Sequence, residues 1–465
     1  MELNEKMLKE IVEQVIGSMN NTSLSSDKNQ KGVFDTMSEA LEAVNKAYIE
    51  YKKYSVAQRE KMIEKIRELT LNEADKMAEI GVRETGMGRV SDKIIKHRLV
   101  AEKTPGTEDL NPTVFTGDAG MTLIEMAPYG VIGSITPSTN PSETVICNSI
   151  GMIAGGNGVV FNPHPNAKET ANYAVDLVNR AILEAGGPEN LVVSVKNPTK
   201  ESSDEMMQSP IVRMLVATGG PGVVKALLSS GKKAIGAGAG NPPVIVDDTA
   251  DIEKAGADIV SGSSFDNNLP CIAEKECFVF ANVADRLIDS MQKNGAYLLK
   301  GAQVEELKKI ALVEKNGKYS INKDWVGRDA GKFLKAMGID ADPRLIICET
   351  TADHPFVQVE MMMPILAIVR VSDIDEAIKL AVAAEHGNRH SAHIHSKNID
   401  NLTNFARAVE TTIFVKNAPS YAGIGAGGEG YTTFTIAGPT GEGLTAAHSF
   451  TRSRRCVLVD GLHIV

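Results

Sequence analysis

Residues 130–163 read GVIGSITPSTNPSETVICNSIGMIAGGNGVVFNP. The segments 130–136 and 158–162 are short, apolar and strand-like, and the stretch between them is helical from Ser142 onward. Polar residues and glycines interrupt this apolar stretch, whereas a membrane span needs roughly 18 unbroken apolar residues. A strand, a helix and a second strand in this order indicate a parallel α/β sheet.

The same alternation of strand-like and helical segments continues along most of the chain. Residues 35–103 are helical in pattern, 167–185 form a further helix, and 212–218 are followed by a helix from Val223. A second α/β block runs from about 242 to 415. Short β segments outside these blocks are 114–115, 121–126 and the tail 451–465. We therefore expect an α/β protein with two parallel-sheet domains and a small additional β element.

Composition and charge narrow the class of protein. The chain has 465 residues, 43% hydrophobic and 23% charged, which fits an ordinary globular protein of two or three domains. The net charge of −10 disfavours nucleic acid or an anionic membrane as the main partner, because both attract basic clusters. We find no secretory signal, and five cysteines without a pairing pattern indicate a reducing cytoplasm.

The first residues form a separate unit. In residues 1–19 the apolar side chains recur at helical spacing, and the polar run 20–33 that follows is typical of a flexible linker. Such a helix could pack on the body of the protein or serve as an oligomer contact. A membrane anchor is disfavoured, because the polar face carries four Glu and two Lys.

Two glycine-rich segments could bind phosphate. Thr218–Gly222 follows a strand and opens a helix, so its backbone N–H groups could meet a phosphate. Gly236–Gly240 superficially resembles a dinucleotide fingerprint, but the spacing is wrong and a strand follows it. Either segment could equally be a tight turn.

Among the cysteines, one stands apart. Cys271 ends the polar, proline-marked turn 267–271, and an exposed turn of this kind suits a reactive thiol. The other four are expected in an apolar helix or in strands, where we interpret them as buried, inert thiols: Cys147, Cys277, Cys348 and Cys456.

Histidines and one glutamate leave alternatives open. His390, His393 and His395 suggest a metal site, but no further ligand has suitable spacing, so we predict no metal. Glu360 could be a surface carboxylate or a cofactor contact, and its spacing does not decide.

Taken together, the motifs of this chain resemble the aldehyde dehydrogenase superfamily, and within it the CoA-acylating propionaldehyde and acetaldehyde dehydrogenases of bacterial microcompartments. The resemblance covers the whole chain. It rests on five segments in the right order and spacing: APYGVIGSITPSTNP (127–141), FNPHP (161–165), NNLPC (267–271), EMMMP (360–364) and RRCVLVDG (454–461).

The resemblance implies a role for each matching residue. Cys271 matches the nucleophile, and Asn140 matches the amide that, with a backbone N–H, stabilises the oxyanion. The implied contacts of the NAD cofactor are Thr136, Pro163, His164, Gly219, Gly220 and Glu360. The implied NAD-binding domain is 34–112 with 128–234, the catalytic domain is 235–416, and the oligomerisation strands are 113–127 and 445–465.

Two departures from the hydrolytic members bear on cofactor and product. Asn162 replaces a lysine at the adenosine site, so the choice between NAD and NADP stays open, with NAD favoured. The glutamate that activates water aligns with Gly236, and no carboxylate occurs between Ser229 and Val246. Without a base, water with a pKa near 15.7 attacks a thioester slowly, whereas a thiol with a pKa of about 8–9 is already partly ionised.

We therefore expect a CoA-acylating enzyme that converts a short aldehyde, NAD and CoA to acyl-CoA and NADH through a Cys271 thioester. Propionaldehyde is the favoured substrate and acetaldehyde the next. The alternatives are a hydrolytic aldehyde dehydrogenase and a non-catalytic shell-cargo protein. The resemblance further implies that residues 1–19 are an encapsulation peptide that binds a shell protein, that the enzyme lies within a microcompartment in the cytoplasm, and that it forms a homodimer or homotetramer.

Overall fold

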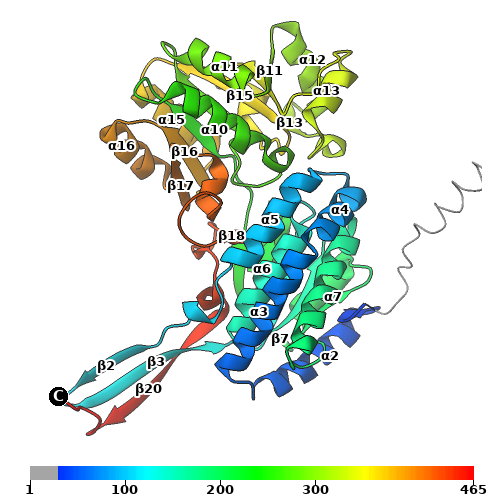
Figure 1. Cartoon of the computed structure of the whole chain (residues 1–465), viewed down its shortest axis with the longest axis vertical. Coiled ribbons are helices and arrows are strands. Elements are labelled where there is room, and N and C mark those ends of the chain that lie inside the picture. Colours follow the sequence, from blue (N-terminus) through cyan, green and yellow to red (C-terminus); the bar gives the residue numbers. More distant parts are fainter. Residues whose placement is uncertain (1–29) are drawn as a thin grey trace, which may run out of the picture.

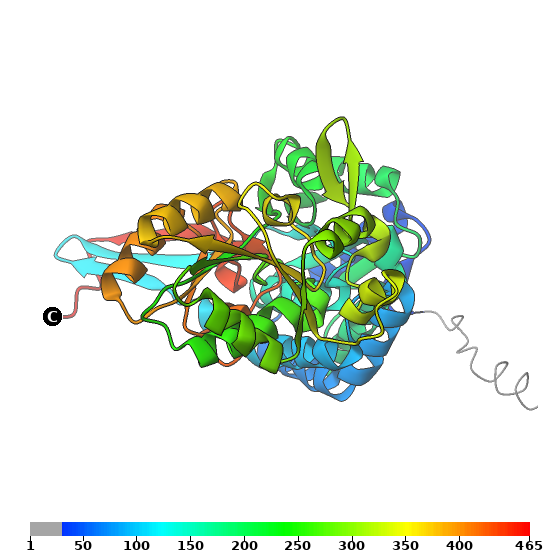
Figure 2. The ribbon, with the colours of Figure 1, turned by 90° about the horizontal axis from the view of Figure 1, so that it is seen from above.

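The computed structural model describes residues 30–465, so the predicted N-terminal helix 1–19 lies outside the described residues. The chain forms two α/β lobes, one above the other in Figure 1, and a long β arm that leaves the first lobe. Figure 2 shows from above that the arm extends away from both lobes. Within the described range, no helix is long and apolar enough to cross a membrane.

The first lobe is built on a six-stranded sheet in which all neighbouring strands are parallel. Its strands, in spatial order, are β1 (Val33–Phe34), β6 (Val192–Val195), β5 (Gly158–Pro163), β4 (Val131–Thr136), β7 (Val212–Thr218) and β8 (Lys233–Ala237). Its helices are α2 (Met37–Tyr51), α3 (Val56–Asn72), α4 (Ala74–Thr85), α5 (Val90–Lys103), α6 (Pro141–Ala154), α7 (Lys168–Glu184), α8 (Lys200–Gln208) and α9 (Pro221–Leu228).

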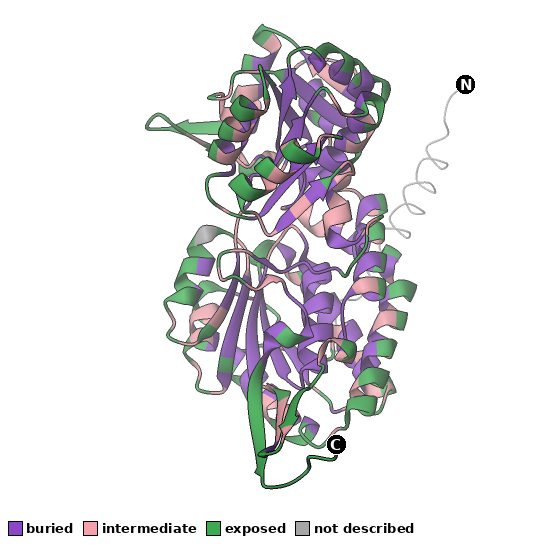
Figure 3. Cartoon of the chain, turned by 90° about the vertical axis from the view of Figure 1, so that its left-hand side faces the viewer, coloured by how far each residue is buried: buried purple, intermediate pink, exposed green. Residues whose placement is uncertain are grey.

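The strands of this sheet are apolar without alternation because both faces are covered. Ile132 and Phe161 join a core with α3, α6 and α7, whereas Val131 and Val160 join a second core with α2, α8 and α9. β4 and β5 are buried along their whole length, and Figure 3 shows the strands as buried ribbons. This is the burial pattern of a parallel sheet between two helical layers.

The second lobe contains a seven-stranded parallel sheet. Its strands, in spatial order, are β11 (Ala296–Leu299), β14 (Leu345–Glu349), β15 (Ile365–Val371), β10 (Glu276–Phe280), β9 (Pro243–Val246), β16 (Ser391–His395) and β17 (Ile413–Lys416). The helices around it are α10 (Ile252–Ser264), α11 (Ala284–Lys293), α12 (Ala302–Ala311), α13 (Ala330–Ala336), α14 (Pro355–Gln358), α15 (Ile374–Glu385) and α16 (Ile399–Val409). A hairpin of β12 (Leu312–Lys315) and β13 (Lys318–Ile321) projects from this lobe.

The arm is a three-stranded antiparallel sheet of β2 (Thr113–Gly117), β3 (Gly120–Pro128) and β20 (Thr451–Val459), with β3 in the centre. Both outer strands are almost entirely exposed, as Figure 3 shows. Cys456 lies in β20 and is exposed, so the prediction that it is a buried thiol was wrong. It is exposed because neither lobe covers the arm, whereas Cys147, Cys277 and Cys348 are buried as predicted.

Before β20 the chain returns from the second lobe to the first. The short strands β18 (Ile436–Ala437) and β19 (Gly443–Leu444) form a small hairpin there. Thr435 Oγ1 donates to Asn148 Oδ1 over 3.0 Å, and the Phe434 N–H lies 3.4 Å from Cys147 Sγ, so this segment is anchored to α6. The composition of this segment did not predict its position on the first lobe.

Candidate active site

Five of the predicted cofactor contacts lie at one edge of the first sheet. Thr136 ends β4 and is the register partner of Pro163, which ends β5. His164 follows Pro163, and Gly219 and Gly220 follow β7. These positions are the carboxyl ends of adjacent parallel strands, which is where open α/β sheets bind their ligands.

This edge has the features that a dinucleotide needs. No side chain lies within 4 Å of a Cβ built at Gly219 or Gly220, so a phosphate could approach the backbone before α9. The buried Thr136 Oγ1 has no hydrogen-bond partner among the described residues. Partial burial and Lys323 of the second lobe lower the pKa of His164, so its imidazole is neutral at physiological pH. The residues present therefore fit a nicotinamide dinucleotide.

Asn162 occupies the position at which the hydrolytic members have a lysine, and both of its side-chain polar atoms form hydrogen bonds within the first lobe. Its side-chain oxygen accepts from Ser202 Oγ over 2.6 Å, and its amide nitrogen donates to the Thr199 carbonyl over 3.4 Å. It therefore anchors the start of α8.

Asn140 is the residue immediately before α6, and its side chain is buried. The side-chain oxygen Oδ1 accepts a hydrogen bond of 2.6 Å from Lys96 Nζ. Among residues 30–465, the only hydrogen-bond partner of the amide nitrogen Nδ2 is Thr139 Oγ1, over 3.3 Å. The N–H donors of this amide therefore face away from the lysine.

The loop 266–271 carries Cys271 and has an unusual backbone. Three successive residues, Asp266, Asn267 and Asn268, have positive φ values of 47°, 56° and 66°. Asp and Asn tolerate this conformation better than other residues with a Cβ. Side-chain bonds hold it, since Asn267 donates to the Gly327 carbonyl (2.9 Å) and Asn268 to the Ser263 carbonyl (2.8 Å).

A buried lysine also stabilises the loop 266–271 through hydrogen bonds. Lys275 Nζ donates to the Asn268 carbonyl over 2.9 Å, to Asn268 Oδ1 over 2.6 Å and to the Pro270 carbonyl over 3.3 Å. Burial lowers the pKa of this ammonium, and the carboxylate of Glu360 opposes the effect.

Cys271 is partly exposed. Burial is the main cause that raises its pKa to about 12, the carboxylate of Glu360 raises it further, and the ammonium of Lys275 lowers it. Glu360 itself is half-buried, and burial raises its pKa while Lys275 and the Gly240 N–H lower it. The sixth predicted cofactor residue, Glu360, is therefore close enough to interact electrostatically with the thiol.

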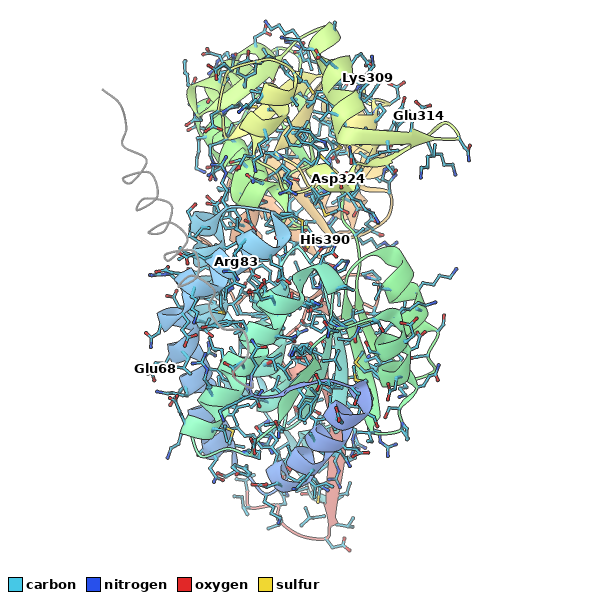
Figure 4. The ribbon with its side chains drawn as sticks, turned by 90° about the vertical axis from the view of Figure 1, so that its right-hand side faces the viewer. Glu68, Arg83, Lys309, Glu314, Asp324 and His390 are labelled. Carbon is cyan, nitrogen blue, oxygen red and sulfur yellow. The ribbon has the colours of Figure 1, made fainter. Side chains whose placement is uncertain are left out.

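His390 also lies close to Cys271, although its sequence context suggested only a metal ligand. A Cβ built at Gly240 would lie 2.9 Å from His390 Cγ and 3.0 Å from the Cys271 carbonyl oxygen, so only glycine fits between them. Burial lowers the pKa of His390 to about 4, and its Nε2 has no partner among the described residues. Figure 4 labels His390 at the junction of the two lobes. The pattern before β16 contains no signal that distinguishes this histidine from His393 and His395.

Gly236, which aligns with the water-activating glutamate of the hydrolytic members, lies in β8 and faces α9. A Cβ there would lie 2.6 Å from Val224 Cγ1, so a glutamate would require the helix to shift. Among the described residues, no group of three or more His, Cys, Asp or Glu side chains could hold a metal ion.

The arrangement suits covalent chemistry on a carbonyl carbon. It combines a partly exposed cysteine, a fixed amide donor and a neutral imidazole next to an edge that is open to a dinucleotide. A nucleophile together with preorganised donors for a developing oxyanion is what acyl transfer requires.

Comparison with known proteins agrees with this geometry. The chain is 49% identical over its full length to the full-length acetylating acetaldehyde dehydrogenase EutE of Salmonella typhimurium. It is 48% identical to the CoA-propanoylating propanal dehydrogenase of the same organism, over 93% of each chain.

Solved structures give the same result. The propionaldehyde dehydrogenase of Rhodopseudomonas palustris, with bound CoA and an acylated cysteine, superimposes with a TM-score of 0.91 at 54% identity, covering 93% of this chain and 99% of the other. The enzyme of the Clostridium phytofermentans fucose utilisation bacterial microcompartment gives 0.92 at 56% identity, covering 94% and 100%. Residues 26–438 match the aldehyde dehydrogenase family. The fold, the site and these relatives together show that the chain belongs to the aldehyde dehydrogenase family.

Proposed function

We propose that this protein is a CoA-acylating aldehyde dehydrogenase that oxidises a short aldehyde with NAD and CoA to acyl-CoA and NADH. Propionaldehyde is the favoured substrate and acetaldehyde the next. The observation that carries the proposal is that Lys96 links the Asn140 amide to Asp266, which opens the loop that carries the partly exposed Cys271. The similar enzymes from Salmonella typhimurium and Rhodopseudomonas palustris support the acyl-CoA product.

In the first half of the reaction, Cys271 Sγ releases its proton to solvent and bonds to the aldehyde carbon. The carbonyl π electrons move to oxygen, and the Asn140 Nδ2–H and the Cys271 backbone N–H donate to the oxyanion. Each donor of this kind is typically worth about 10²–10³ in rate. A nicotinamide dinucleotide held by Thr136, Pro163, His164, Gly219, Gly220 and Glu360 would take up hydride from the same carbon, and an acyl thioester would remain on Cys271.

In the second half, the thiol of CoA gives up the proton that finally restores the Cys271 thiol, and its sulfur attacks the thioester carbon. The bond from this carbon to Cys271 Sγ breaks, and acyl-CoA leaves. Among the described residues, Glu360 is the carboxylate with the largest electrostatic effect on Cys271. We assign it to the ribose of the cofactor and not to activation of water.

Two further proposals concern assembly. We infer that the exposed arm pairs with other subunits, because β2 and β20 are open strand edges with apolar side chains. Encapsulation of the enzyme through residues 1–19 stays a prediction, because these residues lie outside the described range. The similarity to an enzyme of a fucose utilisation microcompartment supports it.

The requirement for CoA tests the function directly. Steady-state NADH formation from propionaldehyde should fall by about 10²-fold or more when CoA is omitted, because the acyl-enzyme must then be hydrolysed by water without a general base. Cys271→Ser should lower the rate with CoA by at least about 10³-fold. Equal rates of NADH and free acid formation with and without CoA would instead show a hydrolytic enzyme, and no turnover of any aldehyde would show a non-catalytic cargo protein.

Replacement of Glu360 tests its assignment. Glu360→Gln removes a negative charge that disfavours the Cys271 thiolate, so the thiol pKa should fall and iodoacetamide should alkylate Cys271 faster at a fixed pH near neutrality. The KM for NAD should rise, while acid formation without CoA should stay at its low level. If acid formation dropped instead, Glu360 would be the base for water, and the explanation of CoA selectivity would be wrong.

Charges placed on the arm should reduce the assembly to smaller species. Phe115 and Val457 both pair in register with Thr122 of β3, and they are 58% and 56% exposed. Phe115→Asp with Val457→Asp should therefore lower the mass measured by light scattering. Val313→Asp is the matched control, because Val313 is an exposed valine (36%) on β12 of the second lobe. An unchanged mass for the arm variant, or an equal loss for the control, would contradict the inference.

A further inference from the structure

Lys96 of α5 is fully buried and lies among three oxygen acceptors. Its Nζ is 2.6 Å from Asn140 Oδ1, 2.8 Å from Glu143 Oε1 and 2.6 Å from Asp266 Oδ2. Asn140 Oδ1 accepts a hydrogen bond from this ammonium, and the two carboxylates form ion pairs with it. Because Lys96 is fully buried, its effect on the reaction must pass through these partners.

The contact with Asn140 determines which way the amide points. A carboxamide has one accepting and one donating end, and only the accepting end can face an ammonium. With Oδ1 held by Lys96, the Nδ2 donors face the opposite side, where their single hydrogen-bond partner among the described residues is Thr139 Oγ1. A flipped amide would place N–H groups against a buried cation. Lys96 thus selects the rotamer in which Asn140 can donate to an oxyanion.

The contact with Asp266 links the same cation to the Cys271 loop. Asp266 opens the loop 266–271, and its Oδ1 accepts from the Arg89 N–H over 2.9 Å. Gly88 precedes Arg89, and a Cβ built at Gly88 would lie 2.1 Å from Asp266 Oδ1, so this close approach needs glycine. One ammonium is thereby bonded to the residue that donates to the oxyanion and to the loop that carries the thiol.

The charge of this cluster is balanced inside the protein. Burial disfavours the ammonium of Lys96, but Asp266 and Glu143 outweigh this effect and raise its pKa above the usual value. Burial likewise opposes ionisation of Glu143, and Lys96 outweighs it and lowers the pKa of Glu143 to about 2. Lys96 is therefore a cation at neutral pH.

We propose that Lys96 is a positioning residue for the reaction, which fixes the Asn140 amide as an oxyanion donor and sets its place relative to the Cys271 loop. The proposal rests on the proposed function. Lys93 provides an internal comparison, because it is also buried in α5 and bonds the same Asp266 Oδ2 over 3.0 Å. Its other contact is the Thr139 carbonyl at 3.5 Å, and it does not contact the Asn140 side chain.

Lys96→Met should lower kcat for NADH formation by about 10²-fold, the loss expected for one oxyanion donor, with little change in the KM for NAD. Lys93→Met, the matched control, should lower kcat by less than about tenfold. Alkylation of Cys271 by iodoacetamide involves no oxyanion, so its rate should change by less than about twofold in Lys96→Met. A purely structural role would slow alkylation and turnover together, and would affect both lysine variants alike.

Loss of Lys96 leaves the buried carboxylate of Glu143 without its partner. The second variant therefore combines Lys96→Met with Glu143→Gln. In this double variant Asp266 still forms its ion pair with Lys93. The control is Glu143→Gln alone. The double variant should melt near the wild-type temperature and still show the loss in kcat, whereas Glu143→Gln alone should stay within about tenfold of wild type. A folded double variant with wild-type kcat would overturn the proposal.

Asn140→Ala separates this inference from the proposed function. Addition of Lys96→Met to Asn140→Ala should cause no further loss, because the amide that Lys96 positions is already gone. A further loss of about 10²-fold would overturn the role of Lys96 and leave the proposed function intact. Full activity of Asn140→Ala would instead contradict the oxyanion assignment on which both depend.

Discussion

The ion pair of Lys96 and Asp266 is the contact on which the site depends. Both side chains are fully buried, they lie 2.6 Å apart, and they come from different lobes, since α5 covers the first sheet and the loop 266–271 precedes β10 of the second. Removal of one partner of a buried pair typically costs about 3–5 kcal/mol. Docking of the lobes, the positive-φ backbone of the loop and the rotamer of Asn140 are therefore stabilised together.

The chemistry of the site follows from which groups are charged and which are neutral. Lys96 and Lys275 bond to Asn140 and to the loop 266–271, which form the frame of the site. His390 stays neutral because burial lowers its pKa, and Cys271 stays a thiol in the free enzyme because burial and Glu360 raise its pKa. A thiol that ionises only when it attacks is protected from unspecific reactions, and the preorganised donors stabilise the charge that then develops on the substrate oxygen.

Much of the fold could be predicted from the sequence, because the strands of both sheets are short apolar segments separated by helical periodicity. Cys271 and Asn140 were predicted from motifs, and in the structure Lys96 links Asn140 to Asp266, which opens the loop that carries Cys271. Three features of the structure could not be predicted from the sequence. Lys96 and Glu143 look like ordinary helix residues, and their burial depends on how the lobes dock. His390 is distinguished by its close approach to Gly240, which the sequence does not show. Cys456 is exposed because the arm leaves the body of the protein.

The acyl-enzyme on Cys271 is the most direct test of the central claim. The enzyme is mixed with propionaldehyde and NAD without CoA, quenched in acid and digested, and the peptide that contains Cys271 is analysed by mass spectrometry. It should carry one propionyl group, in an amount equal to the NADH formed, and addition of CoA before the quench should remove it. An unmodified Cys271 peptide after NADH has formed, or a propionyl group on another cysteine, would contradict the assignment of the nucleophile.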